Sequence, residues 1–267
     1  MSGVDGASSA IVDVHPTAVL DPTVDLGADV TIGAYAVLGP GVTIGAGSVI
    51  GPHVVIERDT ALGEGCRVHP SAVLGGDPQD LKYAGEPSRL IVGDRTVIRE
   101  CVTLNRGTAA HGRTEIGSDC LIMAYVHVAH DCVIGDHVVL ANGVTMGGHV
   151  RIEEYVVVGG LTAIHQFAQI GCHAFVGGLA AVMKDVAPYV KAAGNPLKLY
   201  GLNTVGLQRR GFSDEVRREL RQAYRLFFQS KLNISQALER AKRELRAGPE
   251  VDRFLAFVER SERGITV

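Results

Sequence analysis

The sequence has no long apolar run and no targeting segment. No stretch approaches the roughly 20 consecutive apolar residues that a membrane-spanning helix needs. Residues 1–6 lack the basic start and the apolar core of a secretory signal peptide. We therefore expect no membrane span and a cytoplasmic protein.

Cysteine patterns with a structural role are also missing. The five cysteines form no CxxC pair and no spacing typical of a disulfide framework or a zinc site. The composition is otherwise ordinary, with a formal net charge of −3. We expect no disulfide, no bound metal, no cofactor and no nucleic-acid partner.

What the sequence does contain is a strict six-residue apolar repeat. Every sixth position from Val14 to Val182 carries a large apolar side chain at 26 of 29 positions, the exceptions being Asp80, Glu86 and Ala110. Six residues match neither the helical period nor the heptad. A fixed short period indicates stacked units whose apolar faces only their neighbours can cover.

The residues around each large apolar one indicate the shape of the unit. Two positions before it the chain places a small or β-branched residue, such as Val126 before Val128, and these two positions share one face of a strand. Glycine often follows it, where a side chain would hinder the start of a turn. Five prolines, from Pro16 to Pro70, occur two positions after it, as expected at a bend. We predict one short strand per six residues, each ending in a corner.

This pattern resembles the left-handed parallel β-helix of the hexapeptide-repeat acyltransferases, in which three six-residue units complete one triangular coil. Residues 18 apart should then stack on adjacent coils. We expect a lead-in over residues 1–13, an all-β helix over 14–188 and a C-terminal α-helical domain over 189–267. Residues 77–90 leave the repeat and return in phase, which predicts an ejected loop, and 109–113 predict a shorter one.

The C-terminal part predicts helices with a basic character. Ser213 can cap a first helix whose apolar stripe ends at Phe227, a second follows over 233–246, and a third precedes Gly264. Over residues 209–263 we count 14 Lys plus Arg against 9 Asp plus Glu, a balance of +5. These charges are either solvated helix faces or the docking surface for an acidic protein partner.

The chemistry is expected in a Val-His-Val-Ala-His-Asp-Cys segment in the middle of the repeat. His127 precedes an inward residue and so points outward, and His130 falls at the corner position. Asp131 can orient His130 as a general base, and 18 residues further on Gly148 offers a backbone N–H that no side chain obstructs. Cys132 takes an inward position, so we predict direct acyl transfer without an acyl-cysteine.

Together with several distant motifs, this segment resembles the family of UDP-N-acetylglucosamine acyltransferases that begin lipid A synthesis. The resemblance covers essentially the whole chain. Its other motifs are Gln-Asp-Leu-Lys-Tyr-Ala-Gly-Glu-Pro at 79–87, Arg-Gly-Thr at 106–108, His-Gln-Phe at 165–167 and Gly-Leu-Gln-Arg-Arg-Gly-Phe at 206–212. The resemblance implies transfer of a (R)-3-hydroxyacyl chain from acyl carrier protein to the glucosamine 3-hydroxyl of UDP-N-acetylglucosamine.

The resemblance also implies a role for each residue of the site. His130 would be the general base, Asp131 would orient it, and the Gly148 amide would stabilise the oxyanion. The implied substrate contacts are Asp80 and Lys82 to acyl or phosphate groups, His127, His149 and His165 to the sugar and acyl chain, and Asn203, Arg209 and Arg210 to the nucleotide, partly from a neighbouring subunit. Gln79 and Gln166 complete the substrate-binding set.

Three positions carry further expectations. The resemblance implies that the residue at Gly178 closes or leaves open the end of the acyl groove, although Gly178 is equally consistent with a second turn glycine. An open groove favours a long donor of about fourteen carbons, because each buried methylene contributes about 0.8 kcal/mol. Asn105 and Val205 stand where better-known members have histidine and glutamate, which puts one polar contact and one nucleotide contact in question.

Two other functions are compatible with the same fold. The sister N-acyltransferase of the pathway carries an extra N-terminal domain, for which a repeat that starts by Val14 leaves no room. A zinc-dependent carbonic anhydrase on this helix would use histidines of adjacent coils, and His127, His149 and His165 could be imagined in that role. Such a lyase would have no use for a basic helical domain.

Assembly and substrate detail are the remaining expectations. A triangular prism with a one-sided site favours a homotrimer with active sites at the subunit clefts. The sequence leaves open the acyl length and whether the acceptor atom is the sugar oxygen or the nitrogen of a 3-amino analogue.

Overall fold

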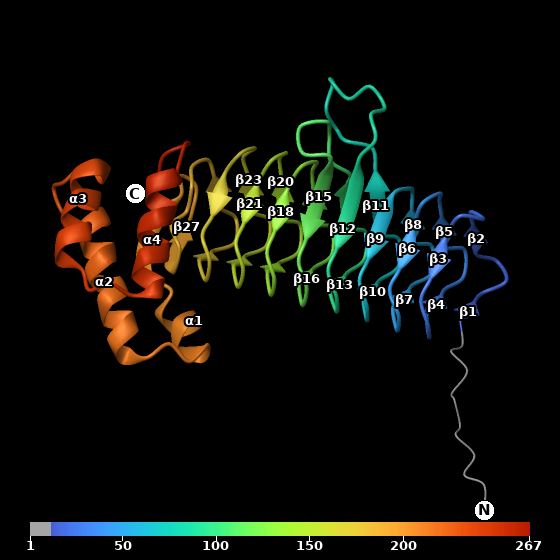
Figure 1. Cartoon of the computed structure of the whole chain (residues 1–267), viewed down its shortest axis with the longest axis horizontal. Helices are drawn as coiled ribbons and strands as arrows, with labels where there is room; N and C mark the ends of the chain where they lie inside the picture. The colour runs from blue at the N-terminus through green and yellow to red at the C-terminus, as the bar shows by residue number, and fades with distance from the viewer. Residues whose placement is uncertain (1–11) are drawn as a thin grey trace, which may run out of the picture.

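The protein is a long triangular coil that ends in a group of helices (Figure 1). The computed structural model describes residues 12–267, so most of the lead-in expected over residues 1–13 lies outside the described residues. The coil strands are two to four residues long, and neighbouring coils pair in parallel through to β27 (Val190–Ala193).

The strands form three sheets, one on each side of the coil. Sheet A contains β1 (Asp13–Val14), β4 (Thr31–Ile32), β7 (Val49–Ile50), β10 (Arg67–Val68), β13 (Val97–Ile98), β16 (Leu121–Ile122), β19 (Val139–Leu140), β22 (Val157–Val158), β25 (Phe175–Val176), β27 and β28 (Lys198–Leu202). Sheet B contains β2 (Val19–Leu20), β5 (Val37–Leu38), β8 (Val55–Ile56), β11 (Val73–Gly76), β14 (Thr103–Asn105), β17 (His127–Val128), β20 (Thr145–Met146), β23 (Ala163–Ile164) and β26 (Ala181–Val182). Sheet C contains β3 (Asp25–Leu26), β6 (Thr43–Ile44), β9 (Thr60–Leu62), β12 (Arg89–Val92), β15 (Arg113–Ile116), β18 (Val133–Ile134), β21 (Arg151–Ile152) and β24 (Gln169–Ile170). The fold is the predicted left-handed parallel β-helix.

The strand register confirms the 18-residue coil and shows where it lengthens. Val37 pairs with Val55, 18 residues on, as predicted. Across the two ejected loops the offset grows, because Leu90 pairs with Thr60 and with Thr114. The two insertions therefore add whole six-residue units, which is why the apolar repeat returns in phase.

The inward positions form the core of the coil. From Ile32 onward, the large apolar residues of the repeat are buried, as in Ile50 and Val128, and so are the small residues two positions earlier, as in Val126 and Cys132. This confirms the predicted inward pair.

The corners correct one detail of the sequence interpretation. The left-handed backbone conformation falls three positions after the large apolar residue, as in Asp131 and His149 with φ near 60°. Proline one position earlier and a positive φ here are the signature of a type II turn. The glycine directly after the strand has another reason, because a Cβ on Gly33 would lie 2.7 Å from the backbone nitrogen of Pro52 on the next coil. Close approach between coils, rather than a special φ, requires that glycine.

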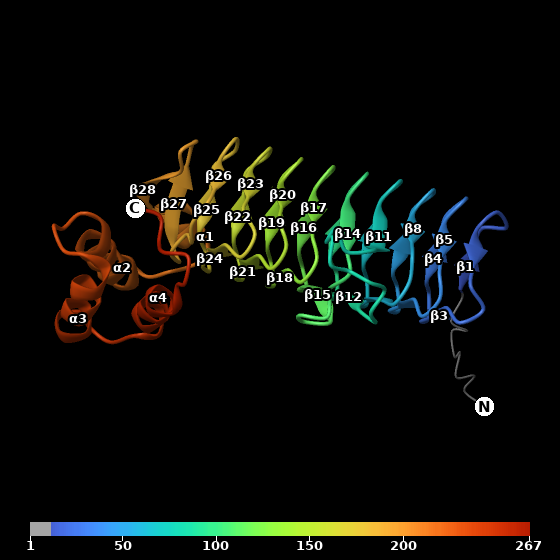
Figure 2. The ribbon, with the colours of Figure 1, turned by 90° about the horizontal axis from the view of Figure 1, so that it is seen from above.

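Both ejected loops leave the coil at one edge, between sheets B and C. The first connects β11 to β12 and the second connects β14 to β15, and they project on the same side (Figures 1 and 2). The connections from β17 to β18, β20 to β21 and β23 to β24 continue the same edge. We call this line of corners the B/C edge, and it carries His130, Gly148 and Gln166.

Four helices follow the coil: α1 (Thr204–Arg209), α2 (Asp214–Phe228), α3 (Ile234–Glu244) and α4 (Pro249–Arg260). Ser213 caps α2 as predicted, and Asn233 forms a capping box at the start of α3. Arg253 of α4 forms ion pairs with Glu153 and Glu154 of the coil. The short α1 and the antiparallel strand β28 were not predicted from the sequence. Among residues 12–267, no helix has the length and apolar character needed to cross a membrane.

Candidate active site

His130 and Asp131 form a buried pair at the B/C edge, directly after β17. The Nδ1 atom of His130 lies 2.9 Å from Oδ2 of Asp131. The Asp131 side chain is fully buried, and the His130 side chain keeps 12% of its surface exposed. Because Nδ1 donates to the carboxylate, the lone pair of the imidazole is on Nε2, which is the atom that a general base needs.

The second loop holds the carboxylate of Asp131 in place. The Thr108 amide donates to Oδ1 at 2.9 Å, and the Thr108 hydroxyl donates to Oδ2 at 2.6 Å. The Asp131 amide in turn donates to the hydroxyl of Thr114. Burial acts to raise the pKa of Asp131, but the hydrogen bonds from Thr108 and His130 outweigh it and lower that pKa below its usual value. The carboxylate is therefore charged and fixed when it orients His130.

Gly148 lies against the imidazole from the next coil, as the 18-residue spacing predicts. A Cβ at Gly148 would be 2.4 Å from Cε1 and 2.6 Å from Nε2 of His130, so only glycine leaves room for the ring. Among residues 12–267, the Gly148 N–H donates to no other group. A backbone donor without a partner, on a residue packed against the imidazole, is the element that an oxyanion formed in acyl transfer requires.

Cys132 points inward, as predicted. Its side chain is fully buried in the core, and its Sγ lies 3.3 Å from the Gly147 carbonyl. Burial raises the pKa of this thiol to about 12, so it is a neutral thiol near pH 7. The geometry favours His130 over Cys132 as the reacting group.

His149 is a second histidine that faces Asp131. Its Nε2 lies 3.7 Å from Oδ2 of Asp131, and its ring meets the His130 ring edge-on at 5.1 Å. Phe167 stacks on it at 4.5 Å with the planes 3° apart, and His111 of the second loop meets it at 5.5 Å. Burial lowers the pKa of His149 despite the nearby carboxylate of Asp131, so this ring is neutral near pH 7.

The other two predicted histidines stand apart from this cluster. His127 on the outer face of sheet B bonds through Nδ1 to the Thr103 hydroxyl at 2.8 Å, and burial lowers its pKa. His165 bonds through Nδ1 to the Gln166 carbonyl at 3.0 Å, and the Gln166 side chain is exposed.

The three histidines considered as possible metal ligands, His127, His149 and His165, do not form one cluster. Within residues 12–267, the side chains whose ligand atoms lie within 4.8 Å of one another are His130, Asp131 and His149, without His127 or His165. Both oxygens of Asp131 already accept hydrogen bonds within the chain. This donor set suits the orientation of a base better than coordination of a metal.

The first loop carries three predicted contact residues. Gln79 and Lys82 are exposed, and the Asp80 carboxylate accepts a hydrogen bond from the Lys82 amide at 2.9 Å. Asp80 acts electrostatically on His149, which indicates that the loop approaches the cluster. The loop tip therefore offers these groups to a ligand at the B/C edge.

The root of this loop is fixed by the pair Asn105 and Arg106. The buried Arg106 guanidinium donates to the Gly75 carbonyl and to the Asp77 carboxylate, and it lies 3.2 Å from the Tyr83 hydroxyl. The Asn105 amide donates to the Asp77 carbonyl at 2.6 Å. Asn105 thus has a structural role at the loop root.

The predicted nucleotide residues line one hollow of about 630 Å³ on the outer face of sheet A. Arg209 and Arg210 come from the end of α1, and Val205 is 61% exposed at the same place. Asn203 caps α1, because its Oδ1 accepts from the Gly206 amide and its Nδ2 donates to the His173 carbonyl. The side chain of Asn203 is therefore already committed within the chain.

Gly178 lies on a different edge from His130. It belongs to the corner between β25 of sheet A and β26 of sheet B, which we call the A/B edge. The residue is exposed, and a Cβ there would lie 3.0 Å from the Gly160 carbonyl oxygen. A single chain therefore does not bring Gly178 to the base.

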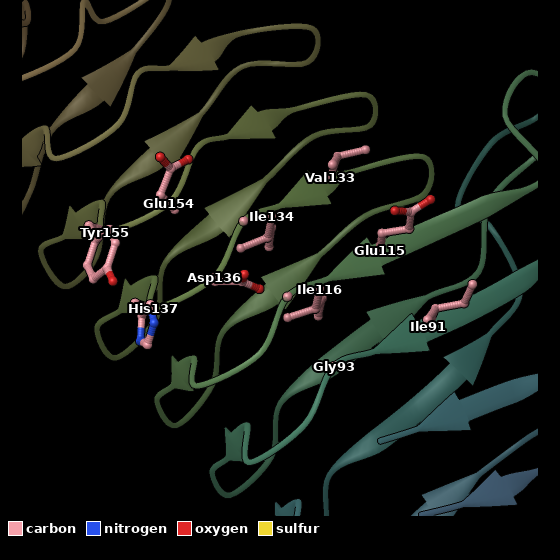
Figure 3. Close-up of a pocket in the computed structure, with 12 residues that line it drawn as sticks. Ile91, Gly93, Glu115, Ile116, Val133, Ile134, Asp136, His137, Glu154 and Tyr155 are labelled. Atoms are coloured by element: carbon pink, nitrogen blue, oxygen red, sulfur yellow. The ribbon is translucent and has the colours of Figure 1, made fainter. Parts of the chain in front are cut away.

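Two further hollows lie on the outer face of sheet C. One, of about 790 Å³, is bordered by His111, His149 and Phe167 and by Arg260 at the end of α4 with the residues that follow it. The other, of about 630 Å³, contains none of the sequence-predicted site residues (Figure 3). In that hollow the Glu154 carboxylate is already paired with Arg253.

Several site residues were not predicted from the sequence. Thr108 belongs to the Arg-Gly-Thr motif, but no role was predicted for it. Its hydrogen bonds to Asp131 depend on a contact between two coils. Phe167 likewise belongs to the His-Gln-Phe motif but had no predicted role, and Thr114 and His111 carried no signal. Each reaches the cluster from a position that only the stacking of coils brings close.

Comparisons with known proteins agree with this fold and identify the family. Residues 185–266 match the model for domain 2 of UDP N-acetylglucosamine O-acyltransferase, and residues 23–58, 41–76 and 113–148 match the bacterial transferase hexapeptide model. An acyl-[acyl-carrier-protein]–UDP-N-acetylglucosamine O-acyltransferase of Chlorobaculum parvum is 60% identical over 91% of this chain and 93% of that protein.

Solved structures show the same similarity. LpxA from Acinetobacter baumannii superposes with a TM-score of 0.93 at 42% identity, over 95% of this chain and 99% of that one. A UDP-N-acetylglucosamine acyltransferase from Bacteroides fragilis gives 0.93 at 38% identity, with the same coverage. Neither the zinc-dependent lyase nor the sister N-acyltransferase finds support in these comparisons. The chain belongs to the UDP-N-acetylglucosamine O-acyltransferase family.

Proposed function

We propose that this protein transfers a (R)-3-hydroxyacyl chain from acyl carrier protein to the 3-hydroxyl of UDP-N-acetylglucosamine, the first step of lipid A synthesis. The observation that carries the mechanism is the free Nε2 of His130 against the unobstructed Gly148 backbone. The names of the relatives supply the two substrates. We place the reaction in the cytoplasm.

The reaction is a direct transfer between the two substrates. Nε2 of His130 takes the proton of the sugar hydroxyl while the oxygen of that hydroxyl attacks the thioester carbonyl. The negative charge that develops on the carbonyl oxygen meets the Gly148 N–H. Collapse of the tetrahedral intermediate breaks the carbon–sulfur bond, and the carrier thiolate receives the proton from the His130 imidazolium, which Asp131 stabilises. No acyl-enzyme is formed, because Cys132 is neutral and buried.

A product analysis tests this proposal. The protein is incubated with UDP-N-acetylglucosamine and hydroxyacyl carrier proteins of several lengths, and the product is identified by mass spectrometry and by its lability to mild alkali. An alkali-labile ester is expected. A protein that acylates only the 3-amino analogue, giving a stable amide, would contradict the proposed acceptor.

The carrier-protein site is proposed on α2. Arg218, Arg221 and Arg225 follow one another at helical spacing and are exposed, and within residues 12–267 they form no ion pair. Acyl carrier proteins are acidic, so an unpaired basic stripe provides the complementary charge. Most other basic side chains of the helices, such as Arg240, are paired with a carboxylate.

Replacing Arg218, Arg221 and Arg225 together by alanine should raise the KM for acyl carrier protein about tenfold, which is about 1.4 kcal/mol. In the wild type this KM should rise with salt as the Debye length shrinks below about 10 Å, and the variant should lose that dependence. The KM for the UDP-sugar should change little. The matched control is Arg240→Ala, which removes an exposed arginine already paired with Glu244 at 2.8 Å. Equal use of acyl-CoA, or a donor KM that is flat with salt, would contradict the proposal.

A homotrimer is proposed because the site is incomplete in one chain. His130 lies on the B/C edge and Gly178 on the A/B edge, and these two edges border sheet B. The outward residues of sheet B carry no acidic or basic charge near pH 7: Val19, Val37, Val55, Val73, Thr103, His127, Thr145, Ala163 and Ala181. An uncharged flat face suits self-association. Three copies that pack through sheet B would bring the A/B edge of one chain to the B/C edge of the next.

Gly178→Met should shorten the preferred donor. The wild type is expected to prefer a 3-hydroxyacyl chain of about fourteen carbons, and the methionine should move the optimum to about ten, because four fewer buried methylenes remove about 3 kcal/mol. The measurement is kcat/KM against donors of graded length. If the substitution lowers kcat/KM by the same factor for every donor length, Gly178 is only a turn residue. A wild-type preference for ten-carbon donors would contradict an open groove.

A further inference from the structure

A ladder of stacked aromatic rings runs along the third edge of the prism, between sheets C and A. His137 stacks on Tyr155 at 4.6 Å, Tyr155 on His173 at 4.8 Å, and His173 on Tyr189 at 5.7 Å, with the planes within 17° of parallel. Each of the four has a positive φ, so each occupies the same turn position on its own coil. The first two spacings match the distance between neighbouring strands, and the stack follows from the coil itself. Figure 3 shows His137 and Tyr155 at adjacent corners.

The ladder meets α1 through a cation–π contact. The guanidinium carbon of Arg210 lies 5.3 Å from the centre of the Tyr155 ring, within the range of such contacts. Arg210 is half-buried and, within residues 12–267, pairs with no carboxylate. Its backbone N–H closes the end of α1, which fixes the start of the side chain. The ring of Tyr155 therefore contacts the guanidinium of Arg210, and Arg210 also lines the nucleotide hollow.

The neighbours of Tyr155 favour this contact electrostatically. Burial, assisted by Arg210, lowers the pKa of His173 to about 4, so the ring below Tyr155 is neutral near pH 7. Glu154, the one carboxylate adjacent to Tyr155 in the chain, is occupied by Arg253 of α4. Within residues 12–267, no carboxylate therefore competes with the ring as an ion-pair partner of Arg210.

We propose that Tyr155 is a positioning residue that presents the Arg210 guanidinium to the diphosphate of the nucleotide. The inference rests on the proposed function, in which Arg210 contacts the nucleotide. An arginine that is free in solution loses side-chain entropy when it binds a phosphate, and an arginine already ordered on a ring loses less. Tyr155 thus contributes to nucleotide affinity without touching the acyl-transfer centre at His130.

The test compares Tyr155→Leu and Tyr155→Phe in the full-length protein. Binding of UDP is measured by calorimetry, and kcat and KM are measured with acyl carrier protein and UDP-N-acetylglucosamine. Tyr155→Leu should weaken UDP binding about tenfold and raise the sugar-nucleotide KM by a similar factor, with kcat within about twofold. Tyr155→Phe retains the ring and should restore wild-type affinity.

A matched variant shows whether the loss of a stacked tyrosine ring alone changes UDP affinity. Tyr35 stacks on His53 at 5.1 Å in an equivalent corner of the A/B edge, where no arginine lies over the ring. Tyr35→Leu should leave UDP affinity unchanged while it lowers thermal stability about as much as Tyr155→Leu. If Tyr155→Leu binds UDP as well as the wild type does, the positioning role is refuted. A wild-type protein that binds no UDP at all would instead refute the proposed function.

Discussion

Replacing His130 by alanine should lower kcat by about two to four orders of magnitude, the usual contribution of a positioned general base. The reason is geometric: Asp131 holds Nδ1 of this ring at 2.9 Å, which leaves Nε2 as the one basic atom beside Gly148. Binding of the UDP-sugar should change little, because the ring acts on a proton rather than on the nucleotide. Single-turnover kinetics together with calorimetry separate the two effects.

Cys132→Ser is the matched control for this prediction. The cysteine lies two residues from the base, but its side chain is in the core and its thiol is neutral near pH 7. A serine hydroxyl can reproduce the contact with the Gly147 carbonyl, so the variant should keep most of its activity and lose about 1 kcal/mol of stability or a little more. An inactive Cys132→Ser beside an active His130→Ala would show that transfer proceeds through the thiol.

Gly148→Ala should lower kcat about a hundredfold. The added methyl group would lie 2.4 Å from Cε1 of His130, so the imidazole must move by a substantial part of an ångström. Displacement of a catalytic group on this scale costs about two orders of magnitude in rate. Gly148 does not have a left-handed φ, so alanine fits its backbone and the coil should still fold.

A double-mutant cycle tests whether the methyl acts through the ring. In a protein that already carries His130→Ala the clash is absent, so adding Gly148→Ala should cost little further activity. Full additivity of the two losses would contradict this explanation and would point to a separate defect at the backbone. The melting temperatures of the three variants show whether any loss of rate reflects unfolding.

The juxtaposition of His130 and Gly148 could be predicted from the sequence because, within the repeat, the position of a residue in its six-residue unit determines its place in the coil. With 18 residues per coil and alternating faces, Val128 must point inward, His130 must lie at a corner, and Gly148 must lie beside it. The same rule placed Cys132 in the core. In a strictly periodic chain, the place of a residue within the repeat therefore indicates its place in the fold.

Residues outside the repeat could not be placed in this way. The sequence indicated that the two loops leave the coil, but only the tertiary structure determined that both leave at the B/C edge and that Thr108 reaches the Asp131 carboxylate. Asn105 and Arg106 likewise gain their role from the loop that folds back on them.

The reason for the glycine directly after a strand also came only from the structure. A sequence shows glycine after a strand, but it does not show that the backbone of the next coil, as at Gly33 and Pro52, leaves no space for a Cβ. The ring ladder through Tyr155 follows the 18-residue spacing, but its contact with Arg210 at the end of α1 depends on where the helix packs. What the sequence by itself determined is therefore the repeat and everything in phase with it. Contacts made by loops and helices were decided by the tertiary structure, because these segments lie outside the repeat and the repeat does not fix where they pack.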